Sequence, residues 1–332
     1  MCQLLGMNCN APTDVTFSFR GFARRGGRTD QHTDGWGIAF FEGSGEDEKG
    51  LRHFVDHLPA CESPVAELIG RYPIKSRNVI AHIRKATQGR VALENCHPFV
   101  RELWGRYWVF AHNGDLKDFT PRLHASFRPV GSTDSERAFC WIMQELAKSH
   151  ADVPSVRELS LTLRELAGSI APHGTFNFLL SNGQALWAHA STSLFYVERR
   201  HPFAHATLSD EDVSVNFQEH TRPTDRVALV VTAPLTTNES WTAFAPGELK
   251  VKWSVDRGLV PKFGIRNLKR TKHTTTQESS SALSWLANCL LRLGTKTLYR
   301  FEIQTAAADK STTPKNAFLQ WPIAWKWKCS DG

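Results

Sequence analysis

The sequence predicts an α+β layered sandwich rather than a regularly alternating parallel sheet. Three observations favour this fold class: predicted strands outnumber predicted helices, the helices come in groups, and 41% of the 332 residues are hydrophobic, enough for a substantial core. The length suggests about two domains. No uncharged apolar run reaches the ~18 residues that span a bilayer, and the polar N-terminus does not resemble a secretory signal.

Short runs rich in Val, Ile, Phe or Trp and bounded by Gly, Asn or Pro predict the strands. These runs are residues 2–7, 35–42, 78–84, 107–112, 175–181, 185–190 and 226–232. Apolar residues at helical spacing predict helices at residues 17–25, 63–72, 133–149 and 154–170. The third helix is the clearest, because Thr133 and Glu136 have the spacing of a capping box. We expect Trp36 and Trp108 to lie in the core.

The positive charge gathers at the C-terminal end. Residues 1–254 hold 27 Lys and Arg against 28 Asp and Glu, whereas residues 255–332 hold 13 against 5. We therefore expect a main domain at residues 2–254 and a basic, weakly structured C-terminal extension at residues 255–332. A main domain without net positive charge has no reason to follow a phosphate backbone, so we expect a small-molecule substrate and neither nucleic acid nor a membrane as partner.

The number, spacing and position of the cysteines predict the cellular compartment and a candidate nucleophile. Seven Cys without a C-x-x-C pair predict a reducing compartment, the cytoplasm. Cys2 follows the initiator Met, which is removed before small residues, so we expect Cys2 to become the N-terminus. One residue would then carry a thiol with a pKa near ~8.5 and an α-amine with a pKa near ~7.7–8.0, which can accept the thiol proton. Taken alone, Cys2 is explained more simply as a small apolar residue of a first strand.

Three further segments favour a catalytic role. Arg84 ends a predicted strand, Asn113 and Gly114 end the next strong strand, and Asp134 opens the capped helix. An Asn side chain and the N–H of a following Gly can together stabilise an oxyanion. An Arg and an Asp supply the cation and the anion that bind the carboxylate and amine of an α-amino acid.

Each of these residues also has a purely structural explanation. Asn-Gly is typical of a type I′ hairpin turn, Arg84 could end a strand in a salt bridge, and Asp134 suits any helix start. His82, His97 and His112 lack a nearby carboxylate pair at metal-ligand spacing, so we interpret them as structural and expect no metal or organic cofactor. Cys140 is expected to be buried and inert.

The motifs that carry a resemblance follow each other in a fixed order. They are the N-terminal Cys, D-G-W-G at residues 34–37, H-x-R-x-A-T at 82–87, H-P-F at 97–99, H-N-G at 112–114 and T-D-S-E at 133–136. In this order they resemble the class II glutamine amidotransferases, and most closely the small stand-alone bacterial branch related to thiol-pathway γ-glutamyl amidohydrolases. The likeness runs from Cys2 to about Gly247.

The resemblance implies an N-terminal-nucleophile hydrolase fold, a four-layer αββα sandwich of two antiparallel sheets between helical layers. It implies that Cys2 attacks the side-chain amide of glutamine, forms a γ-glutamyl thioester, releases ammonia and yields glutamate after hydrolysis. The implied roles are an oxyanion hole at Asn113 and Gly114, α-carboxylate binding at Arg84, α-amine binding at Asp134, and supporting pocket residues Thr87 and His97. Lys85 and Gln88 stand where better-known members have an aromatic residue and a His.

The fate of the ammonia stays open at this point. About 77 residues follow Val255, too few for a typical synthase domain. An ammonia-accepting protein in trans, or plain hydrolysis of a γ-glutamyl compound, is therefore implied. One alternative is a γ-glutamyl peptide or thiol-conjugate amidohydrolase, because Arg84 and Asp134 would contact only the glutamyl head. Another is a non-catalytic protein that binds an anionic partner through its basic tail.

Overall fold

The computed structural model describes residues 2–43, 50–253 and 266–267. These residues belong to a compact unit that runs to Arg270, and a second unit comprises Thr271–Gly332. The predicted extension at 255–332 lies outside the described residues except for the two residues 266 and 267. Of the helices described, none is long and apolar enough to cross a membrane.

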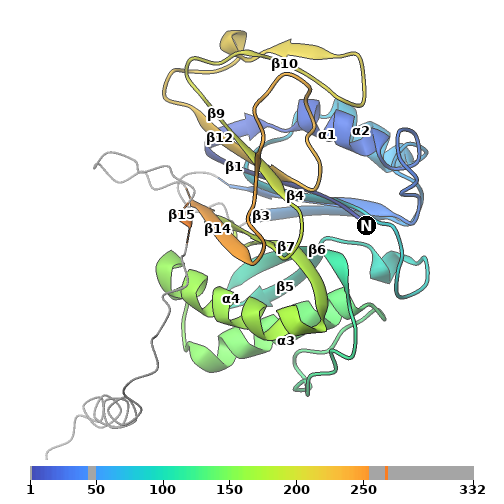
Figure 1. Ribbon diagram of the computed structural model, residues 1–332, viewed down its shortest axis with the longest axis vertical. Coiled ribbons are helices and arrows are strands. Elements are labelled where there is room, and N and C mark those ends of the chain that lie inside the picture. The colour runs from blue at the N-terminus through green and yellow to red at the C-terminus, as the bar shows by residue number, and fades with distance from the viewer. Residues whose placement is uncertain (1, 44–49, 254–265, 268–332) are drawn as a thin grey trace, which may run out of the picture. The chain divides into compact units, whose positions relative to one another are not determined.

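Two antiparallel sheets form the centre of the first unit (Figure 1). The seven-stranded sheet has the order β13 (Thr242–Ala243), β9 (Phe195–Arg200), β12 (Arg226–Val231), β1 (Gln3–Asp14), β4 (Lys75–Ile83), β2 (Trp36–Glu42) and β3 (Gly50–Asp56). The six-stranded sheet has the order β15 (Arg266–Asn267), β14 (Glu248–Trp253), β8 (Ala185–Ala190), β7 (Gly174–Ser181), β6 (Arg106–Leu116) and β5 (Phe99–Leu103). A separate hairpin pairs β10 (His205–Thr207) with β11 (Ser214–Asn216).

Helices pack on each sheet through apolar clusters. α1 (Thr16–Arg24) and α2 (Pro64–Arg71) bury Phe19, Phe22 and Ile69 against the seven-stranded sheet. α3 (Asp134–Ser149) and α4 (Val156–Ile170) bury residues such as Phe139 and Leu163 against the six-stranded sheet. A third cluster contains residues from both sheets and packs them face to face: Leu4, Ile80, Val230, Val109, Leu179 and Leu186. The mixed α and β fold that the sequence predicts is confirmed.

Each predicted strand and helix overlaps an observed element, and most ends differ by at most four residues; the largest difference is at β1, which runs to Asp14 where the prediction ends at residue 7. Trp36 and Trp108 are buried in the core, as predicted. The strands missed by the sequence analysis include β3, β5, β9 and β14. β3 lies at a sheet edge with several exposed residues, and β14 alternates apolar residues with Lys250 and Lys252, so neither has the apolar run on which the prediction relied.

The capping box predicted for α3 is only half formed. The Thr133 hydroxyl accepts a hydrogen bond from the Glu136 N–H (3.2 Å), as expected. The Glu136 carboxylate does not return to the cap; it accepts from the N–H groups of Val130 (3.0 Å) and Gly131 (2.7 Å) and pairs with Arg101. A complete capping box occurs instead in α4, between Ser155 and Glu158. A buried carboxylate with better partners thus overrides the local sequence motif.

Candidate active site

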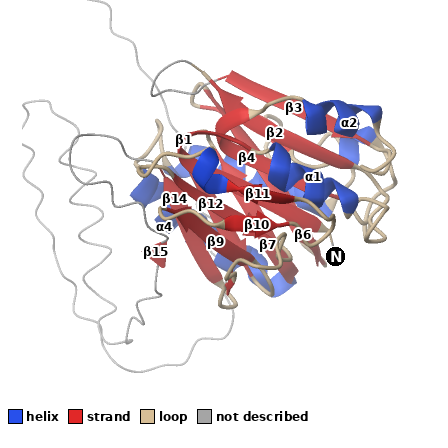
Figure 2. Cartoon of the chain, turned by 90° about the horizontal axis from the view of Figure 1, so that it is seen from above, coloured by secondary structure: helices blue, strands red, loops and turns tan. Residues whose placement is uncertain are grey.

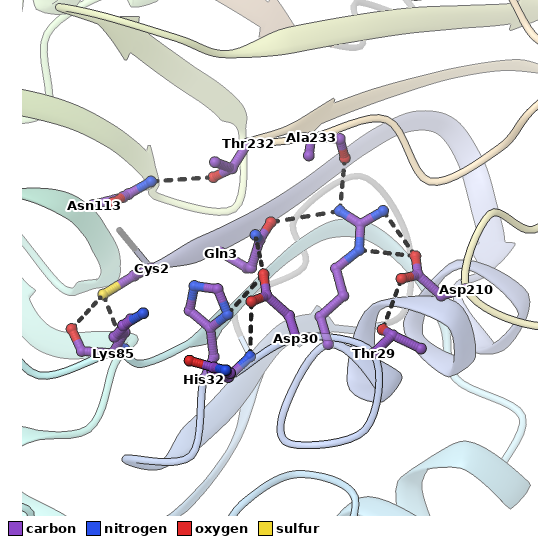
Figure 3. A network of polar contacts seen from close by, with 12 residues as sticks. Cys2, Gln3, Thr29, Asp30, His32, Lys85, Asn113, Asp210, Thr232 and Ala233 are labelled. Carbon is purple, nitrogen blue, oxygen red and sulfur yellow. Dashed lines mark hydrogen bonds and ion pairs between the residues drawn. The ribbon is translucent and has the colours of Figure 1, made fainter.

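Cys2 lies immediately before β1, a strand of the seven-stranded sheet (Figure 2). Its side chain is partly buried. β1 pairs with β4 so that Gln3 faces Ile83, which brings Cys2 beside the residues that follow β4. The Cys2 Sγ accepts a hydrogen bond from the Lys85 N–H (3.3 Å) and can donate to the Lys85 carbonyl oxygen (3.3 Å), as Figure 3 shows. The backbone of one residue therefore holds the thiol in place.

The surroundings of Cys2 favour the neutral thiol. Burial raises the pKa of the Cys2 thiol, while the hydrogen bond from Lys85 and the positive charge of Arg84 lower that pKa by less. At neutral pH the thiol stays protonated, so a reaction that uses its thiolate needs a base close to the sulfur.

A small pocket opens beside Cys2. Six of the residues that the sequence analysis singled out line it: Cys2, Arg84, Thr87, His97, Gly114 and Asp134. Its volume is about 20 Å³. A buried water needs roughly 10–15 Å³ measured in the same way, so the pocket has room for one water molecule and not for an amino acid.

The loop after β4 closes this pocket, and Arg84 holds the loop. The Arg84 side chain is 2% exposed. Its guanidinium donates to four backbone carbonyl oxygens, those of Gln88 (2.9 Å), Gly89 (3.1 Å), Arg90 (3.1 Å) and Asp34 (3.4 Å). These carbonyls, rather than the carboxylate of a strand-end salt bridge, are the partners that the structure gives Arg84.

Asp34 and Gln88 fasten the same loop. The Asp34 carboxylate accepts from the Ala86 N–H (2.7 Å), and Gln88 donates to the carboxylate of Asp115 and to the carbonyl of Leu116 (3.3 Å). The loop is thus pinned at both its start and its middle.

Asp134 is the first residue of α3 and is 4% exposed. Its Oδ2 accepts from the Leu116 N–H (2.8 Å), which ties the helix start to the end of β6. Its Oδ1 lies 3.5 Å from the hydroxyl of Ser135, and that hydroxyl is 2.8 Å from Nδ1 of His112. Asp134 therefore combines the favourable position of any helix-start acid with a place in the pocket wall.

Asn113 and Gly114 do not form a turn, so the hairpin alternative is wrong. Both lie inside β6 and pair with Asn177 and Phe176 of β7. A Cβ atom at Gly114 would lie 1.8 Å from the Thr175 carbonyl oxygen, so this close approach between strands admits only glycine.

The side chain of Asn113 contacts a residue that the sequence analysis did not identify. Its Nδ2 donates to the Thr232 hydroxyl oxygen (3.3 Å), and its Oδ1 is buried without a hydrogen-bond partner. Thr232 directly follows β12. The only sequence signal it gives is a polar residue at the end of an apolar run, which is too common to indicate a site.

The three histidines of the motifs lie together in the interior. Burial lowers the pKa of His82 to about 3 and the pKa of His97 well below its usual value, so both rings are neutral. The centroids of these two rings are 4.2 Å apart, and His82 Nε2 is 3.2 Å from the carbonyl oxygen of His112. Within the described residues, no group of three or more His, Cys, Asp or Glu side chains is placed to hold a metal ion.

A second polar network includes Gln3, the residue after Cys2, and Asp30, Asp210 and Ala233 (Figure 3). The buried side chain of Arg25 is at its centre. Arg25 donates to the carboxylate of Asp210 (2.8 Å), to the carbonyl of Ala233 (2.8 Å) and to the side chain of Gln3 (3.4 Å). Gln3 in turn donates to Asp30 (3.5 Å). This network fixes the residue after Cys2 and the segment that follows Thr232.

Comparison with known proteins shows which family the chain is similar to. Residues 1–279 match the family model for class-II glutamine amidotransferases. A Haemophilus influenzae protein named "Putative glutamine amidotransferase" is 52% identical over 247 residues, which are 74% of this chain and 82% of that protein. "Putative glutamine amidotransferase YafJ" of Escherichia coli is 48% identical over 252 residues, 76% of this chain and 97% of that protein.

A solved structure resembles the fold described above. It is the crystal structure of a "predicted glutamine amidotransferase" from Pseudomonas aeruginosa, with a TM-score of 0.62 and 41% sequence identity. The match covers 81% of this chain and all of that one.

Proposed function

Since this chain belongs to the class-II glutamine amidotransferases, an enzyme family that acts on glutamine, we propose that it hydrolyses the side-chain amide of glutamine to glutamate and ammonia through a γ-glutamyl thioester on Cys2. The observation that carries this proposal is the placement of Cys2. Its sulfur is held by the backbone of Lys85 at the wall of a pocket that also contains Arg84, Gly114 and Asp134.

In the first half of the reaction the thiol is activated and acylated. After removal of Met1, the free α-amine of Cys2 accepts the proton of its own thiol, which burial keeps neutral. The sulfur attacks the γ-carbonyl carbon, and the oxyanion accepts hydrogen bonds from Asn113 Nδ2 and the Gly114 N–H. The C–N bond then breaks, ammonia leaves with the proton from the α-amine, and the γ-glutamyl thioester remains.

In the second half a water molecule cleaves the thioester. The α-amine takes a proton from this water, whose oxygen attacks the thioester carbonyl. The C–S bond breaks, the proton returns to the sulfur, and glutamate leaves. The same two donors stabilise the second oxyanion.

Substrate entry requires the loop at residues 85–90 to move. The pocket of about 20 Å³ does not admit glutamine, and the terminal N–H groups of Arg84 are occupied by loop carbonyls. We propose that the loop opens, that the α-carboxylate of glutamine replaces carbonyl partners of Arg84, and that Asp134 binds the α-amine, with Thr87 and His97 completing the wall. Each lost carbonyl contact of Arg84 is then exchanged for a hydrogen bond to a negatively charged acceptor.

We also propose a specific fold class and a cellular compartment for this enzyme. Two sheets packed face to face with helices on each support the four-layer N-terminal-nucleophile hydrolase sandwich. The mechanism needs no metal or organic cofactor. We further propose a cytoplasmic enzyme that either releases its ammonia or passes it to an accepting protein in trans.

A γ-glutamyl peptide or thiol conjugate is the second candidate substrate. Lys85 supports it, because this exposed cation follows Arg84 and its backbone contacts the nucleophile, where better-known members have an aromatic residue. A cation at this place suits a leaving group that carries a carboxylate. Rates of glutamate release from glutamine and from γ-glutamyl peptides at equal concentration separate the two substrates.

Replacement of Cys2 tests the proposed function. We expect Cys2→Ala to reduce glutamate release from glutamine by at least about 10³-fold, because the nucleophile is lost. Cys61→Ala removes an exposed thiol elsewhere and is the matched control, with activity unchanged. Intact-mass analysis after treatment with a glutamine-mimicking diazo ketone should show loss of Met1 and one adduct in wild type and Cys61→Ala, and no adduct in Cys2→Ala. Full turnover by Cys2→Ala, or by a chain that still begins with Met1, would contradict the proposal.

A further inference from the structure

The side chains of Asn113 and Thr232 each have one hydrogen-bonding group without a partner. Asn113 Oδ1 is buried and accepts no hydrogen bond from the part of the chain that the structure describes. The Thr232 oxygen accepts twice, from the Leu4 N–H (2.9 Å) and from Asn113 Nδ2 (3.3 Å), and within the described residues its own hydrogen finds no acceptor. A free acceptor and a free donor thus lie on two side chains that already touch.

A half-turn of the Asn113 carboxamide pairs them. The oxygen and the nitrogen of a carboxamide have nearly the same shape, so their hydrogen-bond partners decide which occupies which place. After the half-turn, the Thr232 hydroxyl donates to Asn113 Oδ1, and the Leu4 N–H still donates to the Thr232 oxygen. Nδ2 then takes the place of Oδ1 and points away from Thr232, where the described residues give the side chain no hydrogen-bond partner.

Thr232 is held firmly enough to select one orientation. Its own N–H donates to the Leu4 carbonyl (3.1 Å), in addition to the bond that its hydroxyl receives from the Leu4 N–H. Leu4 is two residues from Cys2, so the hydroxyl is fixed relative to the nucleophile strand. The backbone carbonyl of Asn113 accepts from Asn177 Nδ2 (3.2 Å), which fixes Asn113 from the other side. What remains free is the rotation of the carboxamide.

We propose that Thr232 is a positioning residue: its hydroxyl holds Oδ1 of Asn113 and thereby directs Nδ2 at the oxyanion formed when Cys2 attacks. The inference rests on the proposed function, since it concerns the oxyanion hole of that reaction. Thr232 touches neither substrate nor nucleophile and acts through Asn113. Without the hydroxyl, the carboxamide is free to turn its oxygen toward the oxyanion, which repels the developing charge. Binding of glutamine through Arg84 and Asp134 is unaffected.

Kinetics of Thr232→Val and Thr232→Ser in the full chain test the inference. Loss of an oxyanion-hole donor costs about 10²–10³ in kcat, and a misdirected donor should cost somewhat less, so we expect Thr232→Val to lower kcat about 10- to 100-fold. KM for glutamine should change little. Thr232→Ser keeps the hydroxyl and should recover most of kcat. The matched control is Ser160→Ala. Ser160 lies in α4, and its buried hydroxyl accepts a hydrogen bond from Nε1 of Trp187 in β8 (2.8 Å), so its removal should leave kcat unchanged.

Two further measurements separate positioning from general structural support. The γ-aldehyde of glutamate adds reversibly to a cysteine thiolate and places its oxygen in the oxyanion hole, so Thr232→Val should weaken its binding by the same factor as kcat. Binding of the product glutamate should not change. In an Asn113→Ala background, Thr232→Val should cause no further loss of kcat, because its effect passes through Asn113.

The outcomes distinguish this inference from the proposed function. A wild-type chain that releases no glutamate from any γ-glutamyl amide overturns both. If the wild type is active and Thr232→Val has the same kcat and the same affinity for the γ-aldehyde, the role of Thr232 is overturned and the proposed function stands. A loss of kcat that is as large in the Asn113→Ala background also overturns it. If Thr232→Val does not fold, Thr232→Ala replaces it in the same measurements.

Discussion

At the scale of single residues, burial of the Cys2 thiol makes its reactivity depend on a second group. Burial raises the pKa of this thiol, so little thiolate exists at neutral pH. In the proposed mechanism the α-amine of the same residue supplies the base, and an α-amine loses its proton near pH ~7.7–8.0. The proton acceptor therefore becomes available as the pH rises through this range, before the buried thiol would ionise alone.

We therefore predict that kcat/KM for glutamine rises with pH along one ionisation near pH ~7.7–8.0. The measurement is a pH profile of glutamate release between pH 6 and pH 9. A glycine inserted between Met1 and Cys2 moves the α-amine away from the sulfur and should lower kcat/KM by at least about 10³-fold. An inserted variant with the same profile and the same rate as wild type would show that the α-amine is not the base.

At the scale of secondary-structure elements, the pairing of β6 with β7 explains why position 114 is glycine. A Cβ atom at this position would lie only 1.8 Å from the carbonyl oxygen of Thr175, too close for any side chain. We predict that Gly114→Ala destabilises the fold by at least about 2 kcal/mol, because one of two paired strands must shift, and abolishes glutamate release.

Gly168→Ala is the matched control for this substitution. Gly168 lies in α4, and a Cβ atom there would meet nothing within 4 Å. Alanine should therefore stabilise the helix by about 0.5–1 kcal/mol and leave activity unchanged. Urea unfolding of both variants gives the comparison, and equal stability of Gly114→Ala and wild type would contradict the steric argument.

Glu136 stabilises the start of α3 through buried contacts. The Glu136 carboxylate is buried and holds two backbone N–H groups of the preceding segment as well as Arg101. We predict that Glu136→Ala destabilises the fold by about 3 kcal/mol, because these groups lose a buried partner, and raises KM by displacing Asp134.

Glu158 fills the same helix position in α4 and serves as the control. It contacts the Ser155 cap at the surface, so Glu158→Ala should cost much less stability and leave KM unchanged. Urea unfolding and glutamine kinetics of the two variants test the difference. Similar losses for both would mean that the segment before α3 does not depend on Glu136.

Some strands and site residues can be predicted from the sequence, and others cannot. Strands β7 and β8 are rich in buried apolar residues, and the motif residues Cys2, Arg84 and Asp134 lie at the ends of elements. The hydrophobic pattern and the order of the motifs therefore predict both features. Asn113 and Gly114 were ambiguous, because a turn and a strand can share one dipeptide and only the pairing with β7 decides. Asn113 and Thr232 are 119 positions apart, so their contact leaves no local pattern. The contacts of Arg84 are with backbone carbonyls, which every residue has, so the sequence does not mark them either.

At the scale of the whole molecule, the pocket and the three apolar clusters are formed by residues before Arg270. Among the described residues, the last member of the clusters is Val251, and the last residue that lines the pocket is Ser135. The first compact unit ends at Arg270, after β15 has paired with β14. By contrast, the excess of positive charge lies in residues 255–332. The residues of the proposed active site and the basic charge are thus separated along the chain.

This separation predicts that a chain ending at Arg270 keeps its activity. Because it retains every described residue of the site, its kcat for glutamine should stay within about twofold of the full chain, with a similar melting temperature. A chain ending at Asp225 loses β12, the strand paired with β1, and should neither melt cooperatively nor release glutamate. Glutamate release and thermal melting of the three chains decide the question. Loss of activity on removal of residues 271–332 alone would place part of the catalytic machinery in the second unit, and the two-part organisation argued from charge would be wrong.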